Sequence, residues 1–253
     1  TLLAIHYGFQ NKYNCIILPK KKQQFYNKEI IVLNTNNIYK NTKTKYFNNF
    51  MKHNFLDLKM EKTQKLVRNF VNRIYEFPTP KLINENILHI HIRSGDIMIR
   101  KQSMVQPPCD FYCKLIESRN WEKIIIVSED DLSPCINYII HRYNNAYYFG
   151  KNSLEKDIEE LLSARHIMLG RGTFIPSLTL FMPNLLSIHY PADGDSRIHY
   201  FLEVHNPNIC IKYDNYSNYY KQIKDIGGWE YSDKLKNIML SFKSQPMQNE
   251  IKI

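Results

Sequence analysis

The sequence predicts an α/β protein in which a mostly parallel sheet is covered by helices. From about residue 87 to residue 190, short apolar runs alternate with segments of helical periodicity, and this alternation is typical of a parallel sheet. The first run, Ile87–Ile92, is rich in β-branched residues, which favour a buried strand. Polar turns follow three of the runs, at the positions where open α/β sheets place their ligands.

The elements expected after residue 80 follow from these runs. The expected strands are Ile87–Ile92, Lys123–Val127, Ala146–Phe149, Ile167–Leu169 and Leu186–Tyr190. The expected helices are Asp110–Ser118, Leu132–Tyr143 and Ser153–Ala164. Ser153 can cap the third of these helices, and the acidic first turn of that helix suits its dipole. Asn218–Phe242 is partly helical, and the pair Gly227–Gly228 interrupts it.

Residues 1–80 are interpreted as a separate N-terminal lobe, because Pro78 and Pro80 break the chain before the regular alternation begins. Its expected elements are helices at Thr1–Tyr13 and Leu56–Tyr75 and strands at Cys15–Leu18 and Ile30–Leu33. A helix that precedes the first strand indicates an α/β unit whose own first strand lies upstream. Residues 81–215 are the expected second lobe, and residues 216–253 a helical segment with a tail.

Composition and charge narrow the class of protein. The chain has 253 residues, of which 43% are hydrophobic, and this content favours a packed core over disorder. Its net charge of +10 predicts attraction to anions. We expect no nucleic-acid partner, because no RNA- or DNA-binding motif is present. The chain contains no apolar run of about 18 residues, so we expect no integral membrane segment. No signal peptide is visible.

The cysteines predict neither a zinc ribbon nor a disulfide framework. There are five of them, at positions 15, 109, 113, 135 and 210, and no Cys-x-x-Cys pair occurs. An odd, scattered set is most simply explained by reduced thiols. This pattern favours a reducing compartment such as the cytoplasm.

Three polar turns are expected to meet at the carboxyl edge of the predicted sheet. They are Arg93–Asp96, Ser128–Asp131 and Gly170–Phe174. The guanidinium of Arg93 suits bidentate binding of a phosphate, and Gly95 allows a sharp turn. Carboxylates of the second turn can accept hydrogen bonds from a ribose or a base. The third turn can present backbone N–H groups to an anion, so the edge as a whole predicts a nucleotide site.

The same turns carry three blocks that follow one another as in a known family. A His-x-Arg-Arg-x-Asp motif corresponds to His91–Asp96, and a strand that ends in Ser-Asp-Asp corresponds to Val127–Asp131. A helix Asp-Leu-x-x-Met-Ser and a turn Asn-Ser-Thr-Phe-Ser correspond to Ile158–Ser163 and Gly170–Phe174. In this order the chain resembles the α-1,2-fucosyltransferases and the related α-1,6- and protein-O-fucosyltransferases, over roughly residues 88–184.

The resemblance implies a GT-B-like fold of two Rossmann-type lobes, with residues 1–80 on the acceptor side. It also implies inverting transfer of a sugar, fucose in the family, from a GDP-sugar to a glycan hydroxyl, without a metal or other cofactor. Arg93 then neutralises the β-phosphate of the leaving GDP, where a fixed guanidinium is most effective. The candidate nucleotide-sugar-binding residues are His91, Arg93, Ser128, Asp130, Arg171, Gly172, Thr173 and Phe174.

Two departures from the family pattern affect these assignments. Ser94 stands where the family has its second arginine, and Ile175–Ser177 replaces the ending of the third block. Arg171 can restore part of the lost charge, which is an inference from the residues and no property of the family. Asp96 is the candidate catalytic base, and an equally weighted alternative is that it only buttresses Arg93.

Other functions remain as alternatives. Asp193-Gly194-Asp195 has the form that metal-dependent GT-A glycosyltransferases use to hold manganese, although an ordinary turn explains it better. His89 and His91 lie two apart on one face of the expected strand, but no further ligand cluster accompanies them. The non-enzymatic alternative is a basic module that binds glycans or nucleic acid.

Overall fold

The computed structural model describes residues 78–99, 105–172, 174–191, 209–213 and 216–244. The chain divides into two compact units at Pro78 and Thr79. The four elements expected before residue 78 therefore lie outside the described residues. Within the described ranges, no helix is both long and apolar enough to cross a membrane.

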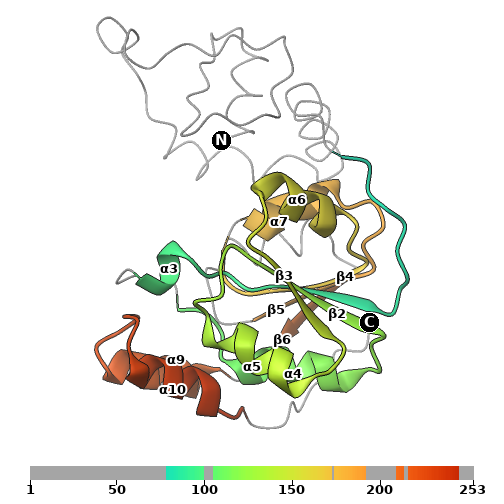
Figure 1. The fold of residues 1–253 in the computed structure, drawn as a ribbon. Helices are drawn as coiled ribbons and strands as arrows, with labels where there is room; N and C mark the ends of the chain where they lie inside the picture. The colour runs from blue at the N-terminus through green and yellow to red at the C-terminus, as the bar shows by residue number, and fades with distance from the viewer. Residues whose placement is uncertain (1–77, 100–104, 173, 192–208, 214–215, 245–253) are drawn as a thin grey trace, which may run out of the picture. The chain divides into compact units, whose positions relative to one another are not determined.

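The second unit contains a sheet of six parallel strands in the order β3-β2-β1-β4-β5-β6 (Figure 1). The strands are β1 Ile87–His91, β2 Lys123–Ser128, β3 Ala146–Gly150, β4 His166–Leu169, β5 Ser187–Pro191 and β6 Cys210–Tyr213. The predicted parallel α/β sheet is thus confirmed, with all five expected strands. The sixth strand, β6, was not predicted.

Helices cover both faces of this sheet, as expected for buried parallel strands. They are α3 Asp96–Ile99, α4 Cys109–Ser118, α5 Pro134–Arg142, α6 Leu154–Leu162, α7 Phe174–Leu178, the 3-10 turn η3 Thr179–Phe181, α9 Ser217–Asp225 and α10 Asp233–Ser241. Figure 1 shows α6 and α7 on one face, and α4, α5, α9 and α10 on the other. Side chains of β1 alternate between these two faces, because successive residues of a strand point in opposite directions.

The ends of the helices follow the expected local chemistry. Ser153 accepts a hydrogen bond from the N–H of Lys156 and so caps α6. Ser232 caps α10 in the same way. Gly227 and Gly228, with φ of +97° and +102°, separate α9 from α10. Glycine adopts this left-handed conformation without strain.

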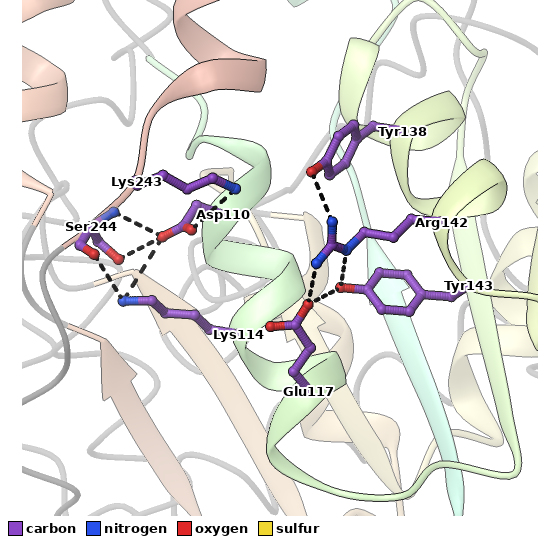
Figure 2. Close-up of polar contacts among 8 residues, drawn as sticks. All are labelled: Asp110, Lys114, Glu117, Tyr138, Arg142, Tyr143, Lys243 and Ser244. Atoms are coloured by element: carbon purple, nitrogen blue, oxygen red, sulfur yellow. Dashed lines mark hydrogen bonds and ion pairs between the residues drawn. The ribbon is translucent and has the colours of Figure 1, made fainter.

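The C-terminal helices belong to the same hydrophobic core as the sheet. Tyr219 and Trp229 are buried with Leu88 and Ile90 of β1. Figure 2 shows the polar contacts between α4 and residues 243 and 244, which follow α10. The carboxylate of Asp110, at the start of α4, accepts hydrogen bonds from both the backbone N–H and the hydroxyl of Ser244. Residues 216–244 are therefore anchored on α4.

A disulfide joins the first turns of α4 and α5, between Cys109 and Cys135. Both cysteines are fully buried, and their Cα atoms are 5.0 Å apart. The expectation of reduced thiols is therefore wrong for this pair. A spacing of 26 residues gives no sign of the contact, which arises because two consecutive crossover helices start side by side on one face of the sheet. Cys113, one turn further along α4, keeps a buried thiol.

Candidate functional site

The sheet places the predicted site at its topological switch point. In the order β3-β2-β1-β4-β5-β6, the chain proceeds in one direction from β1 to β3 and in the other from β4 to β6. The reversal lies between β1 and β4, which pair in register from Leu88 with His166 to His91 with Leu169. Open α/β sheets bind ligands outside the carboxyl ends of the two strands at such a reversal. The turns after His91 and Leu169 are those ends.

Arg93 stands between these two turns. Its guanidinium lies 3.6 Å from the carboxylate of Asp96 in the first turn of α3. On its other side it faces Gly172, where an added Cβ would come within 3.3 Å of Nη1. The side chain is 29% exposed, so the guanidinium, flanked by Asp96 and Gly172, still meets solvent. A cation fixed in this way can bind a phosphate or another anion.

His91 lies at the end of β1, with its ring 5.7 Å from that of Phe174 on α7. Burial, aided by the charge of Arg93, lowers the pKa of His91 to about 4. The imidazole is therefore neutral near pH 7 and adds no positive charge to the site. It can contribute packing and a hydrogen bond at the end of the strand.

Ser94 and Asp130 lock the first turn onto the second. The buried hydroxyl of Ser94 donates to Oδ1 of Asp130. The same oxygen accepts the backbone N–H of Gly95 at 3.1 Å and that of Leu132 at 3.0 Å. The N–H of Ser133 in turn donates to the Ser94 hydroxyl at 3.0 Å. Asp130 was expected to contact the nucleotide, but these bonds commit Oδ1 to bracing the turn of Arg93.

The third turn is held by Gln106, a buried residue that precedes α4. Its side-chain oxygen accepts the backbone N–H of Arg171 at 3.2 Å. The same oxygen lies 2.8 Å from the Cβ that a larger residue would place at Gly170. The backbone carbonyl of Gln106 accepts the hydroxyl of Tyr219 at 3.0 Å. Helix α9 therefore supports the loop between β4 and α7.

Arg171 turns toward α9. Its guanidinium stacks over the ring of Tyr220, 4.4 Å from the ring centroid. Arg171 thus places a second cation next to Gly172 in the chain. Its stacking partner Tyr220 belongs to α9, and this helix lies on the opposite face of the sheet from α7 (Figure 1).

The remaining predicted features of the site are Ser128, the helix after the third turn, Thr173, and the possible metal ligands Asp193 and Asp195. Ser128 lies at the end of β2, where its buried hydroxyl has no hydrogen-bond partner among the described residues. The third turn leads into α7 as expected, but this helix has only five residues, so its dipole is weak. Thr173 lies outside the described residues, as do Asp193 and Asp195. In the described part of the chain, no group of three or more His, Cys, Asp or Glu residues could hold a metal ion.

The sequence did not predict the roles of Gln106 and Tyr220. No local pattern marks either residue: Gln106 merely precedes Pro107 and Pro108, and Tyr220 belongs to a run of tyrosines. Their roles arise from α4 and α9 reaching the carboxyl edge. By contrast, His91, Arg93, Gly172 and Phe174 are brought together as predicted.

A hollow of about 610 Å³ lies elsewhere, between α5 and α10. It begins near Asp131 and is lined by cationic and tyrosine side chains, including Tyr138, Arg142 and Tyr231. Arg142 is already held by Glu117, Tyr138 and Tyr143 (Figure 2). None of the residues around Arg93 and Gly172 lines this hollow. The candidate site lies at the strand ends, where the polar groups converge.

No protein-family model matches the chain, and no curated protein matches it.

Proposed function

We propose that this protein is an inverting, metal-independent glycosyltransferase of the fucosyltransferase type. Its donor is a GDP-sugar and its acceptor a glycan hydroxyl. The observation that carries the proposal is the guanidinium of Arg93, which is fixed against Gly172 at the reversal between β1 and β4. The six-stranded sheet acts as the nucleotide-binding lobe of a GT-B-like arrangement, with residues 1–80 supplying the acceptor side.

In this mechanism Arg93 neutralises the charge that grows on the β-phosphate as the bond to the sugar breaks. A preorganised cation is effective here because it does not have to reorient during the reaction. The backbone of Gly172 borders the same space, and Arg171 adds positive charge nearby. Asp96, 3.6 Å from Arg93, either accepts the proton of the acceptor hydroxyl or holds Arg93 in place.

The test is ligand binding and transfer by the Arg93→Ala variant. Arg165→Ala is a matched control, because Arg165 is 24% exposed and also lies 3.6 Å from one carboxylate, that of Glu85. We expect GDP to raise the melting temperature of the wild-type protein. Arg93→Ala should lower GDP affinity about 100-fold and abolish transfer from GDP-fucose. Arg165→Ala should leave both unchanged.

Equal GDP affinity in wild type and Arg93→Ala would refute the assignment of Arg93. A thermal-shift panel of GDP, UDP, CMP and their sugars identifies the donor in the same experiment. Transfer that requires added manganese would contradict the proposal and favour a metal site at Asp193 and Asp195. Binding to polynucleotide that persists in Arg93→Ala with excess GDP would favour the basic binding module.

A further inference from the structure

The loop after β2 carries three consecutive carboxylates, Glu129, Asp130 and Asp131, which differ from one another in their contacts. Oδ1 of Asp130 is committed to the turn of Arg93, as described above. Asp131 forms an ion pair with Lys151 at 3.3 Å. Among the residues that the structure describes, neither a hydrogen bond nor an ion pair engages the carboxylate of Glu129. The Glu129 side chain is exposed and can therefore meet a ligand.

Gly95 makes room for this carboxylate. Its φ is +64°, and an added Cβ would lie 2.7 Å from Cδ of Glu129. The Glu129 carboxylate therefore rests directly against the backbone of the turn that carries Arg93. Gly95 comes two residues after Arg93, so their Cα atoms are at most about 7 Å apart. The turn has its cation on the β4 side, against Gly172, and a carboxylate on the β2 side.

Such a pair of charges recognises a ligand that is anionic at one end and donates hydrogen bonds at the other. An ionised carboxylate only accepts hydrogen bonds, so it repels a phosphate and binds hydroxyl groups. In nucleotide-binding sheets with this strand order, an acidic residue near the neighbouring strand end receives a ribose hydroxyl. Asp130 is committed to the turn, and Glu129 has the exposure and the position for this role.

We infer that Glu129 accepts the ribose hydroxyls of a ribonucleoside diphosphate and so makes the site select ribonucleotides over deoxyribonucleotides. The inference rests on the proposed function of the Arg93 site. The sequence left the ribose or base contact open among the carboxylates of this loop, and the inference assigns it to Glu129.

The test compares GDP with 2′-deoxy-GDP and inorganic pyrophosphate by calorimetric titration of the full chain. The variant is Glu129→Gln, and the control is Asp131→Asn, a neutralised carboxylate two residues away. Wild type should bind GDP at least about tenfold more tightly than 2′-deoxy-GDP, since the latter lacks a hydrogen bond to a charged group. Glu129→Gln should lower GDP affinity at least about tenfold and leave 2′-deoxy-GDP affinity within about twofold, so that the preference disappears.

Pyrophosphate separates this role from general damage to the site. Removal of a negative charge beside an anion site should leave pyrophosphate affinity unchanged or raise it. Asp131→Asn should behave as wild type with all three ligands. The inference would be overturned if Glu129→Gln kept the full preference for GDP, or if it lost equal affinity for GDP and 2′-deoxy-GDP. Neither result would contradict the role assigned to Arg93. Failure of wild type to bind any nucleoside diphosphate would instead overturn the proposed function.

Discussion

At the residue scale, the site depends on two glycines that lie directly against the side chains proposed to bind the ligand. Gly172 is one: its φ is +151°, and a Cβ there would meet the guanidinium of Arg93. Gly95 is another, because it makes room for Glu129. The sequence identified both glycines as turn residues, but only the packed structure shows which side chains press against them.

We expect Gly172→Ala to weaken GDP binding about tenfold, because the new methyl group displaces Nη1 of Arg93. Gly227→Ala is the control. It has a comparable left-handed φ of +97°, but nothing lies within 4 Å of its added Cβ. Both variants should lose about 1–2 kcal/mol of unfolding free energy, measured by urea denaturation. Equal GDP affinity in both variants would show that Gly172 does not border the ligand.

Asp96→Asn separates the two roles that remain for Asp96. A catalytic base should lose kcat by at least about 100-fold with GDP affinity preserved. A buttress should instead lose GDP affinity, because Arg93 is no longer held. Steady-state kinetics combined with GDP titration distinguishes the two results. Wild-type values of both would remove Asp96 from the site.

At the element scale, the two sides of the site are carried by α4 and α5. The Gln106 segment leads into α4, and Ser133 leads into α5. The disulfide Cys109–Cys135 joins these two helix starts. Periodicity and composition predicted both helices, because apolar spacing and prolines are local signals. They could not predict the disulfide, Gln106 or the bracing by Asp130, because those contacts join segments that meet only in the folded sheet.

Reduction of this disulfide should lower the unfolding free energy by about 3 kcal/mol, because the cross-link restricts the unfolded chain across 26 residues. The measurement is urea denaturation with and without a thiol reductant. Cys113→Ala serves as the control and should keep the full effect of the reductant. A Cys109→Ala/Cys135→Ala variant that shows the same stability as oxidised wild type would contradict this assignment.

At the scale of the whole molecule, buried histidines tie stability to pH. His166, Ser187, His189 and Tyr213 form a hydrogen-bonded chain across β4, β5 and β6. Burial lowers the pKa of His166 to about 4 and that of His189 to about 3. The sequence did not predict this network, because β6, which supplies Tyr213, is a four-residue strand without a distinct hydropathy pattern.

We expect the unfolding free energy to be greatest above pH 6.5 and to fall as the pH drops toward 4. In that interval the unfolded state binds protons on His91, His166 and His189 while the folded state does not, at up to about 1.4 kcal/mol per pH unit for each. Burial raises the pKa of Asp157 to about 6. Protonation of this one carboxyl group in the folded state therefore offsets part of the loss of unfolding free energy caused by the three histidines. Urea denaturation at pH 7 and pH 5 measures the difference. Equal or higher stability at pH 5 would contradict this account.

The strand order of the molecule also explains why the candidate site could be predicted in part. Alternating strands and helices are a local pattern, and the rule that parallel strands share a carboxyl edge brings Arg93 and Gly172 together. Side-chain direction has no such local signal. Arg171 stacks on Tyr220 from a helix about 50 residues further along the chain, and Asp130 faces inward onto Ser94.

The central claim is that a nucleoside diphosphate binds at the reversal between β1 and β4. Hydrogen–deuterium exchange of the full chain with and without saturating GDP tests it directly. The account predicts added protection at residues 92–96, 129–130 and 170–172, with the helices that line the hollow between α5 and α10 unchanged. Protection confined to α5 and α10, or no change at the three turns, would contradict it.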